Sequence, residues 1–522
     1  MICGDRRGSL AEACVRGLSR RATRVALVDG GMGGRQLKAG LLLGAGLALA
    51  QKIKKEETGP RVGVVLPPGA GGTIANLACV LAGKTPVNLN FTSGRAASDS
   101  TIRQAGLKTV ITARAMEEKL GDQFPVAERK LDLGKLLQEE KRKALFWSIL
   151  ALVLPAGLLA SLAGVSRDGG DREAGLLFTS GSTGEPKGVV LTHENILSNL
   201  AQIEGVLGDL KLGSVLGCLP LFHSFGFTVT LWWPLTGGPK VVTYPSPLDP
   251  QALGEVIARH AVDLVVTTPT FLRTLMRRAG KEKLGRLRMV VTGAEKLPES
   301  LRQEFEQNIG VKVFEGYGMT EGSPVIAVNR PGAEKAGTVG RPVQDVEIRT
   351  VEEETQKVLS QGEAGILEFR GPNIFPGYLG RPDLTQKVLR DGWYHSADFG
   401  RVDADGFLTI EGRRARFSKI GGEMVPHGLV EEHLLGWLKS QGLLHEGLQE
   451  LMVTAVEDPK KGESLVVLHS CPIDPMAAEK ALRDEGVPNL WIPKKFIQVR
   501  AVPILASGKL DLAAGRKMAQ NG

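Results

Sequence analysis

A ten-residue segment in the first half of the chain has the composition of a phosphate-binding loop. Residues 179–188, TSGSTGEPKG, combine small hydroxyl side chains, glycines and one lysine, and they come at the end of a strand-like apolar run. Such residues leave backbone N–H groups accessible, and these groups together with Lys187 can surround phosphate oxygens. The segment is not a Walker A loop, because Pro186 stands where GxxxxGK, counted from Gly181, needs its second glycine. A phosphate site is favoured over a plain polar turn, and a P-loop kinase or ATPase is disfavoured.

This loop resembles a motif of the adenylate-forming superfamily, which comprises acyl- and aryl-CoA synthetases, luciferases and the adenylation domains of peptide synthetases. Two further segments resemble motifs of that superfamily and follow in its order. Residues 293–295, GAE, are similar to its adenine-side loop, and residues 315–321, EGYGMTE, to its second nucleotide motif. Asp398, Arg413 and Lys509 stand where the family has a ribose acid, a ribose-side arginine and a catalytic lysine. The resemblance covers roughly residues 35–515.

The resemblance implies an enzyme that uses ATP and Mg²⁺ to activate a carboxylic acid. The acid's carboxylate must approach the α-phosphate, so the site must offset the repulsion of two anions. Glu321 is the expected magnesium ligand, Thr320 is expected to bind the α-phosphate, and Lys509 is expected to reach both anions. Tyr317 is expected to stack on adenine and Asp398 to accept hydrogen bonds from the ribose. The expected nucleotide-binding residues are Thr179, Ser180, Gly181, Ser182, Thr183, Gly184, Lys187, Gly293, Ala294, Glu295, Glu315, Gly316, Tyr317, Asp398 and Arg413.

A histidine between apolar residues is the fourth expected catalytic residue, beside Lys509, Thr320 and Glu321. In the family, the loop matching residues 220–226, PLFHSFG, borders the acyl pocket, and His223 is expected to shape its carboxylate end. A core histidine is the alternative. The neighbouring Trp232 and Trp233 either line an acyl tunnel or belong to the core.

Several stretches are most similar to acyl-acyl carrier protein synthetases, the synthetase half of the bifunctional acyltransferase/synthetase. These are residues 62–92, 292–299, 314–321 and 414–425, whereas the His-x-x-x-x-Asp motif of the acyltransferase half is not found. The resemblance implies an ATP-dependent fatty-acid ligase that forms acyl-AMP and then acylates the phosphopantetheine thiol of acyl carrier protein. The alternatives are a ligase for medium- or long-chain fatty acids and coenzyme A and, less favoured, an inactive adenylate-binding protein.

Strand-like and helical runs alternate from about residue 61 onward. Apolar runs that end in serine, proline or glycine predict strands near 175–180, 214–220, 240–245, 263–269 and 288–293, and helical spacing marks 193–208, 250–260 and 298–308. Repeated βα units predict an α/β fold whose sheets are covered by helices. The apolar run 35–53 predicts a buried helix.

After about residue 345 the sequence pattern changes to short strand-like runs separated by glycine turns, which is typical of antiparallel strands. We expect an N-terminal adenylation domain over residues 1–411, a hinge at 412–419 and a small, mobile α+β domain over 420–522. Two departures from the family pattern occur in this part. Ser396-Ala397-Asp398 replaces the usual Thr-Gly-Asp, and Ala415 occupies the hinge position that usually carries Asp or Lys.

An uncharged stretch, Ala144 to Ser166, follows the basic triplet 141–143. About 20 residues of helix can cross a bilayer, but βα units on both sides belong to one domain, and Pro155, Gly157 and Gly164 weaken a straight helix. We expect a shallow insertion that faces a membrane. A buried helical hairpin and a true span are the alternatives.

Composition narrows the remaining function classes. The chain has 65 Lys and Arg against 57 Asp and Glu, a net charge of +8 over 522 residues. This excess suits anionic ligands, an acidic protein or an anionic membrane, and no basic stripe with aromatics argues for nucleic acid. The five cysteines form no C-x-x-C pair, and no long apolar segment opens the chain. We therefore expect a cytoplasmic protein, peripheral on the inner face of the cytoplasmic membrane.

Overall fold

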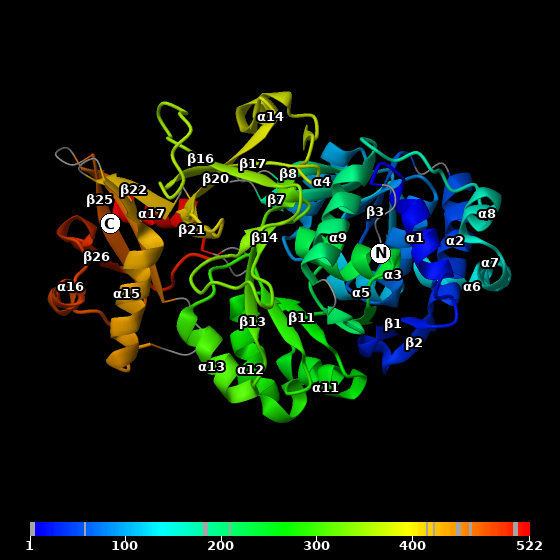
Figure 1. Cartoon of the computed structure of the whole chain (residues 1–522), viewed down its shortest axis with the longest axis horizontal. Helices are drawn as coiled ribbons and strands as arrows, with labels where there is room; N and C mark the ends of the chain where they lie inside the picture. The colour runs from blue at the N-terminus through cyan, green and yellow to red at the C-terminus, as the bar shows by residue number, and fades with distance from the viewer. Residues whose placement is uncertain are drawn as a thin grey trace. The chain divides into compact units, whose positions relative to one another are not determined.

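The chain folds into two compact units (Figure 1). The structure, a computed structural model, describes residues 6–56, 59–180, 186–207, 210–413, 416–420, 423–444, 450–458, 462–504 and 510–522. Unit 1 comprises Met1–Ile348, Glu368–His395 and Asp403–Thr409, and unit 2 comprises Arg349–Leu367, Ser396–Val402 and Ile410–Gly522. The domain bounds expected at 411 and 420 stay predictions, as does the hinge, whose Ala415 lies outside the described residues.

A nine-stranded sheet in unit 1 confirms the predicted α/β class. Its order is β15-β14-β13-β12-β11-β9-β10-β1-β2, and the strands from β13 to β1 are parallel. The strands are β1 (Val25–Asp29), β2 (Arg35–Lys38), β9 (Ser214–Gly217), β10 (Lys240–Thr243), β11 (Leu264–Thr267), β12 (Met289–Thr292), β13 (Val313–Gly318), β14 (Val325–Val328) and β15 (Arg341–Pro342). The short apolar runs therefore form the predicted strands, because both faces of a parallel sheet are covered.

Three helices cover one face of this sheet: α11 (Pro250–His260), α12 (Pro269–Leu284) and α13 (Glu299–Ile309) (Figure 1). Asp249 caps α11 by accepting from the N–H of Ala252 at 3.1 Å, and Thr268 caps α12 in the same way. A proline follows each cap, where its missing N–H costs no hydrogen bond. The resulting core joins strand residues such as Val265 and Val290 to buried helix residues.

A four-stranded parallel sheet forms the N-terminal part of unit 1, in the order β4-β3-β5-β6. It consists of β3 (Arg61–Val64), β4 (Thr85–Asn88), β5 (Thr109–Thr112) and β6 (Arg129–Asp132). The helices of this part are α1 (Leu10–Ser19), α2 (Ala39–Lys55), α3 (Ala70–Leu81), α4 (Arg95–Ala105), α5 (Arg114–Leu120) and α6 (Leu133–Glu139). The helix predicted over 35–53 begins at Ala39, because Arg35–Lys38 pair with β1 instead.

A small antiparallel sheet carries the phosphate-loop candidate. Its order is β18 (Gly377–Tyr378), β8 (Pro186–Thr192) and β7 (Glu173–Ser180). The hairpin of β7 and β8 pairs Thr179 with Lys187 and Ser180 with Pro186. It is followed by α9 (His193–Leu207), whose start is fixed by reciprocal hydrogen bonds between Thr192 and Asn195 at 3.0 and 3.1 Å.

Two five-stranded sheets complete the fold. One has the order β16-β17-β20-β19 with β21 beside β20, and the other has the order β23-β22-β25-β24 with β26 beside β25. Their strands are β16 (Glu347–Val351), β17 (Gly365–Arg370), β19 (Leu389–Arg390), β20 (Trp393–Val402), β21 (Leu408–Arg413), β22 (Phe417–Ile420), β23 (Glu423–Pro426), β24 (Leu451–Asp458), β25 (Gly462–His469) and β26 (Lys495–Gln498). The late helices are α14 (Pro382–Val388), α15 (His427–Ser440), α16 (Pro475–Asp484) and α17 (Leu512–Asn521).

The uncharged stretch forms two helices, α7 (Lys141–Val153) and α8 (Ala156–Leu162), separated at Leu154 and Pro155. Many of its large side chains are exposed, so the buried-hairpin alternative is wrong. Among the described residues, no helix combines the length and the apolar character that crossing a bilayer requires.

Candidate active site

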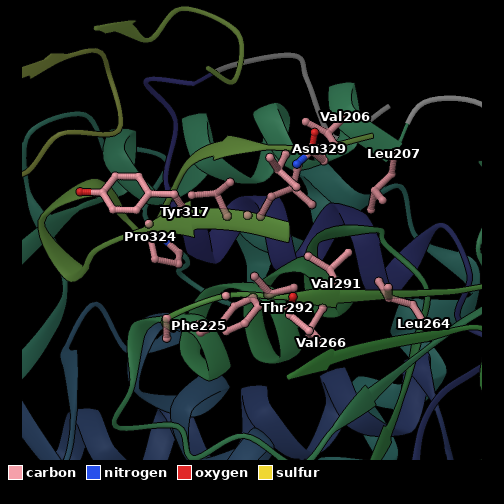
Figure 2. Close-up of a pocket in the computed structure, with 18 of the residues that line it drawn as sticks. Val206, Leu207, Phe225, Leu264, Val266, Val291, Thr292, Tyr317, Pro324 and Asn329 are labelled. Carbon is pink, nitrogen blue, oxygen red and sulfur yellow. The ribbon is translucent and has the colours of Figure 1, made fainter. Parts of the chain in front are cut away.

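An apolar cavity lies between α9 and the nine-stranded sheet in unit 1 (Figure 2). It encloses about 130 Å³. Val206 and Leu207 of α9 line it from one side, and side chains of β11, β12 and β13 line it from the other. A cavity with so few polar groups in its wall suits the apolar part of a small ligand.

The alternation of side chains along β11 and β12 creates this cavity. Leu264 and Val266 point into it, whereas Val265 between them belongs to the core against the helices on the other face. On β12, Val291 likewise lines the cavity and Val290 lies in the core. Successive side chains of a strand point to opposite faces, so these uniformly apolar strands supply both a packed core and a ligand wall.

The two predicted nucleotide motifs border the same cavity. Gly293 and Ala294 line it from the loop after β12, and Gly316 and Tyr317 line it from the end of β13. Carboxyl ends of parallel strands are where α/β sheets bind their ligands. The structure thus brings the expected adenine-side residues next to an apolar chamber.

Ring packing and a short helical turn fix two residues of the second nucleotide motif. Phe369 packs against the Tyr317 ring, with ring centres 5.8 Å apart. The hydroxyl of Thr320, in the 3₁₀ turn η5 (Thr320–Gly322), donates to the hydroxyl of Ser224 at 3.3 Å. Ser224 itself lines the cavity, so the expected α-phosphate ligand is linked to the cavity wall.

Hydrogen bonds to neighbouring elements hold the two acidic residues of these motifs. Glu295 accepts from the hydroxyl and the N–H of Thr270 at 2.7 and 3.3 Å, and so fixes its loop to the first turn of α12. Glu315 accepts from the N–H of Leu297 at 2.9 Å. Burial raises the pKa of the Glu315 carboxyl to about 7, although this hydrogen bond and the charge of Lys296 oppose the rise.

Glu321, Tyr378 and Lys187 form a cluster at the phosphate-loop candidate. The phenol of Tyr378 donates to Oε1 of Glu321 at 2.8 Å, and the Lys187 ammonium lies 5.8 Å from the centre of the Tyr378 ring. Burial, followed by the charge of Glu321, raises the pKa of Tyr378 above its usual range, so its phenol stays a donor. The cluster therefore joins the expected magnesium ligand to the lysine of the loop.

Main-chain pairing and aromatic packing position Tyr378. In β18, Tyr378 pairs with Val189 of β8, and the N–H of Leu379 donates to the carbonyl of Gly188 at 2.8 Å. Phe375 packs edge-on against Tyr378 with ring centres 4.9 Å apart, and its N–H donates to the carbonyl of Glu321 at 2.9 Å. This short segment is therefore hydrogen-bonded to β8 on one side and to Glu321 on the other.

The structure separates the roles expected for the histidine and the two tryptophans. The side chain of His223 is exposed, and its neighbours Ser224 and Phe225 are the residues that line the cavity. Trp232 is fully buried against Phe227, which agrees with the alternative that it belongs to the core. Trp233 lines the cavity and donates from Nε1 to Glu204 at 2.5 Å. A role for His223 in the reaction stays a prediction.

The remaining expected residues lie in unit 2 or outside the described part of the chain. Asp398 of β20 is buried, and its N–H donates to the Ser396 hydroxyl at 3.1 Å. Arg413 ends β21, but its side chain is outside the described residues. Gly181, Ser182, Thr183, Gly184 and Lys509 are outside them as well. Their roles stay predictions.

Comparison with known proteins decides the family. Residues 19–379, more than half of the chain, match the AMP-binding enzyme family. The chain belongs to that family. A long-chain-fatty-acid–CoA ligase from Bacillus subtilis is 32% identical over 344 residues, which are 64% of this chain and 60% of that ligase. This chain thus matches less than two thirds of that relative. A feruloyl-CoA synthase from an Amycolatopsis species is 32% identical over 396 residues, 74% of this chain and 73% of the synthase.

Solved structures of AMP-binding enzymes share the whole fold. The o-succinylbenzoate CoA synthetase MenE from Bacillus subtilis, in complex with the acyl-adenylate intermediate OSB-AMP, has a TM-score of 0.79 and 25% identity, and covers 97% of this chain and 98% of MenE. MenE in complex with ATP and a magnesium ion has a TM-score of 0.78, again at 25% identity, and covers 95% of this chain and 98% of that one. The expected large and small α/β parts of an adenylate-forming enzyme are therefore present.

Proposed function

We propose that this family member is an ATP-dependent acid–thiol ligase that joins an apolar carboxylic acid to coenzyme A. One observation carries the proposal: Gly293, Ala294, Gly316 and Tyr317, the expected adenine-side residues, line the same cavity as the apolar side chains of α9, β11 and β12. A single chamber can then hold an apolar acid next to a nucleotide. This arrangement is what attack of a carboxylate on the α-phosphate needs.

The proposed reaction has two steps, adenylation of the acid and transfer of the acyl group to a thiol. First, a carboxylate oxygen bonds to the α-phosphorus of ATP and pyrophosphate leaves, which gives acyl-AMP. Second, a thiol gives up its proton and its sulfur bonds to the acyl carbon, so that AMP leaves and a thioester forms. Tyr317, held by Phe369, stacks on adenine, and Thr320 donates to the α-phosphate. Lys509 neutralises charge in the first step.

The residues present fit a magnesium ion bound together with the nucleotide. Such an ion takes one or two carboxylates, phosphate oxygens and waters, and it does not need a cage made only of protein. Within the described residues no group of three or more His, Cys, Asp and Glu forms such a cage. Glu321 engages Tyr378 through Oε1 and keeps a second carboxylate oxygen. Glu321 would hold the ion, which would neutralise phosphate charge.

The names of the relatives support coenzyme A as the acceptor better than acyl carrier protein. The Bacillus subtilis and Amycolatopsis relatives are named as a CoA ligase and a CoA synthase. Most side chains of the cavity wall are apolar, including those of Leu, Ile, Val, Met and Trp residues, which favours a fatty acid over a polar acid. Acyl carrier protein remains the acceptor to test against it.

An acid and acceptor panel with purified protein tests the function. We expect pyrophosphate release to require ATP, Mg²⁺ and an apolar acid, and we expect labelled acid to appear on coenzyme A. If the label appears only on holo acyl carrier protein, then acyl carrier protein and not coenzyme A is the acceptor, and the assignment as an acid–thiol ligase still holds. Absence of acid-dependent pyrophosphate release across the panel would refute the proposal.

A further inference from the structure

Exposed apolar side chains are concentrated on α7 and α8. Seven of the fifteen large apolar side chains that are exposed among the described residues lie within residues 145–162. We name these seven the α7–α8 face: Leu145, Phe146, Ile149, Leu152, Val153, Leu158 and Leu162, which are 49–67% exposed. An exposed apolar patch of this kind marks a surface that contacts a partner or a membrane.

The opposite side of α7 is firmly packed, so the α7–α8 face does not arise from a loose helix. Trp147, Ser148 and Ala151 are buried. Helix α2 lies beside α7 (Figure 1), and the two approach so closely that a Cβ on Gly44 would stand 2.1 Å from the Ser148 hydroxyl. A helix that is apolar on both sides belongs in a core or in lipid, and here only one side is covered by protein.

The two helices are too short to cross a bilayer. Helix α7 has 13 residues and α8 has 7, separated at Leu154 and Pro155. At 1.5 Å per residue, α7 is about 20 Å long, less than the ~30 Å of a bilayer core. The fixed contact of α7 with α2 also keeps one side of the helix in protein.

Basic side chains stand at the start of α7. Lys141 and Arg142 are exposed in its first turn, and Lys143 pairs with Glu140 at 2.6 Å. Cations at a helix N-terminus oppose the helix dipole, so this placement does not serve the helix. Apolar side chains next to exposed cations match the boundary between acyl chains and anionic headgroups.

We propose that the α7–α8 face docks the protein on the surface of a bilayer that contains anionic phospholipids. Its apolar side chains enter the boundary between headgroups and acyl chains, and Lys141 and Arg142 contact the headgroup phosphates. The observations that carry this are the exposure of the face, its anchored reverse side and the adjacent cations. It goes beyond the ligase reaction and does not depend on it.

Vesicle flotation with the full chain tests the docking. We expect binding to vesicles of phosphatidylglycerol and phosphatidylcholine. Replacing Phe146, Ile149 and Val153 by Ser should lower the partition coefficient about 100-fold, because three half-exposed apolar side chains no longer enter lipid. A matched control replaces Val126, Leu248 and Met476 by Ser. These are 59%, 76% and 82% exposed and lie outside α7 and α8, and we expect a change of less than about twofold.

The contribution of the Lys141 and Arg142 charges to vesicle binding is measured separately. Lys141→Gln with Arg142→Gln should lower binding to anionic vesicles about tenfold at low salt, and should leave the weaker binding to pure phosphatidylcholine unchanged. Equal losses on both kinds of vesicle would refute the part played by headgroup charge.

A third measurement, of tryptophan quenching, uses a substitution that keeps the α7–α8 face apolar. In Val153→Trp, bromine-labelled acyl chains should quench the added tryptophan, whereas in Leu248→Trp they should not. Failure of the wild type to float with anionic vesicles, or flotation unchanged by the Ser substitutions on the face, would overturn the proposal. So would a dimer that those substitutions convert to a monomer without any lipid binding, since a second copy would then be the occupant.

Discussion

The hydroxyl of Tyr378 donates to Oε1 of Glu321 at 2.8 Å, across 57 residues of sequence. This hydrogen bond joins β18 to the turn η5, and Lys187 of the phosphate-loop hairpin lies over the same tyrosine ring. Three separate segments therefore converge where the family is expected to hold the phosphates and their metal ion. Tyr378 is not one of the residues that line the cavity, so we regard it as a positioning residue for Glu321.

Removal of the phenol tests this role. Tyr378→Phe keeps the ring beside Lys187 and deletes only the donor to Glu321. Since a hydrogen bond to a charged group contributes about 1.5–3 kcal/mol, we expect the Mg²⁺ concentration for half-maximal pyrophosphate release to rise roughly tenfold or more. A magnesium titration at saturating acid measures it.

The chain offers a matched control for that substitution. The phenol of Tyr244 also donates to a carboxylate, Asp249, at 2.9 Å, but at the start of α11. Tyr244→Phe should leave the magnesium dependence unchanged. An unchanged magnesium dependence in Tyr378→Phe as well would show that the tyrosine serves only the packing of β18.

Filling the cavity should change the preferred acid. In Val266→Phe, a larger side chain enters the chamber from β11. We expect kcat/KM to fall by at least about tenfold for long acids and much less for short ones, because a pocket discriminates by roughly 1–3 kcal/mol per methylene that no longer fits. The KM for ATP is the internal reference and should stay constant. Equal losses for every chain length would place the acid elsewhere.

The fold was largely predictable from sequence because its strands are local apolar runs with clear ends. The runs predicted at 263–269 and 288–293 became β11 and β12, and the helix predicted at 250–260 became α11 with an Asp cap before it. Local spacing does not show which face of a fully buried strand meets a helix and which meets a cavity. Val265 and Val266 look alike in the sequence, but one is core and the other lines the site.

The candidate site was predicted only where the family motifs supplied it. Tyr378 was missed, because its position depends on the pairing of β18 with β8, nearly 190 residues earlier in the chain. Residues 376–382, PGYLGRP, have two glycines between two prolines, a composition that is typical of a turn and indicates no strand. For His223, the motif located a loop whose Ser224 and Phe225 line the cavity, but local sequence does not show that the His223 side chain itself is exposed.

The raised pKa of the buried Glu315 carboxyl predicts that this residue makes a pH-dependent contribution to stability. Its pKa is raised by burial from an ordinary value of 4.5 to about 7 in the folded protein. The folded state therefore holds a proton that the unfolded state has lost, and the stabilisation falls as pH rises from about 4.5 to 7. Glu315→Gln keeps an acceptor for the N–H of Leu297 but cannot ionise. The free energy of unfolding of this variant, relative to that of the wild type, should therefore increase as the pH rises through this interval.

Urea unfolding midpoints at pH 5, 6 and 7.5 measure that difference. The exposed Glu304, on the adjoining α13, gives the control Glu304→Gln, whose curve should run parallel to that of the wild type. A Glu315→Gln curve that is also parallel would show that the carboxyl is ionised in the folded protein throughout.

Lys509 is expected to act in adenylation and not in thiol transfer. It follows the Ser507-Gly508 pair near the end of the chain and lies outside the described residues, so the expectation rests on its sequence context. Removing one preorganised donor of positive charge typically costs a factor of 10²–10³ in rate, about 2.7–4 kcal/mol. Lys509→Ala should lose acid-dependent pyrophosphate release by at least that factor, yet it should still acylate the thiol when given preformed acyl-AMP. Single-turnover assays of the two half-reactions separate the possibilities. Equal losses in both would assign the lysine a structural role, and near-normal adenylation would mean that another residue carries the charge.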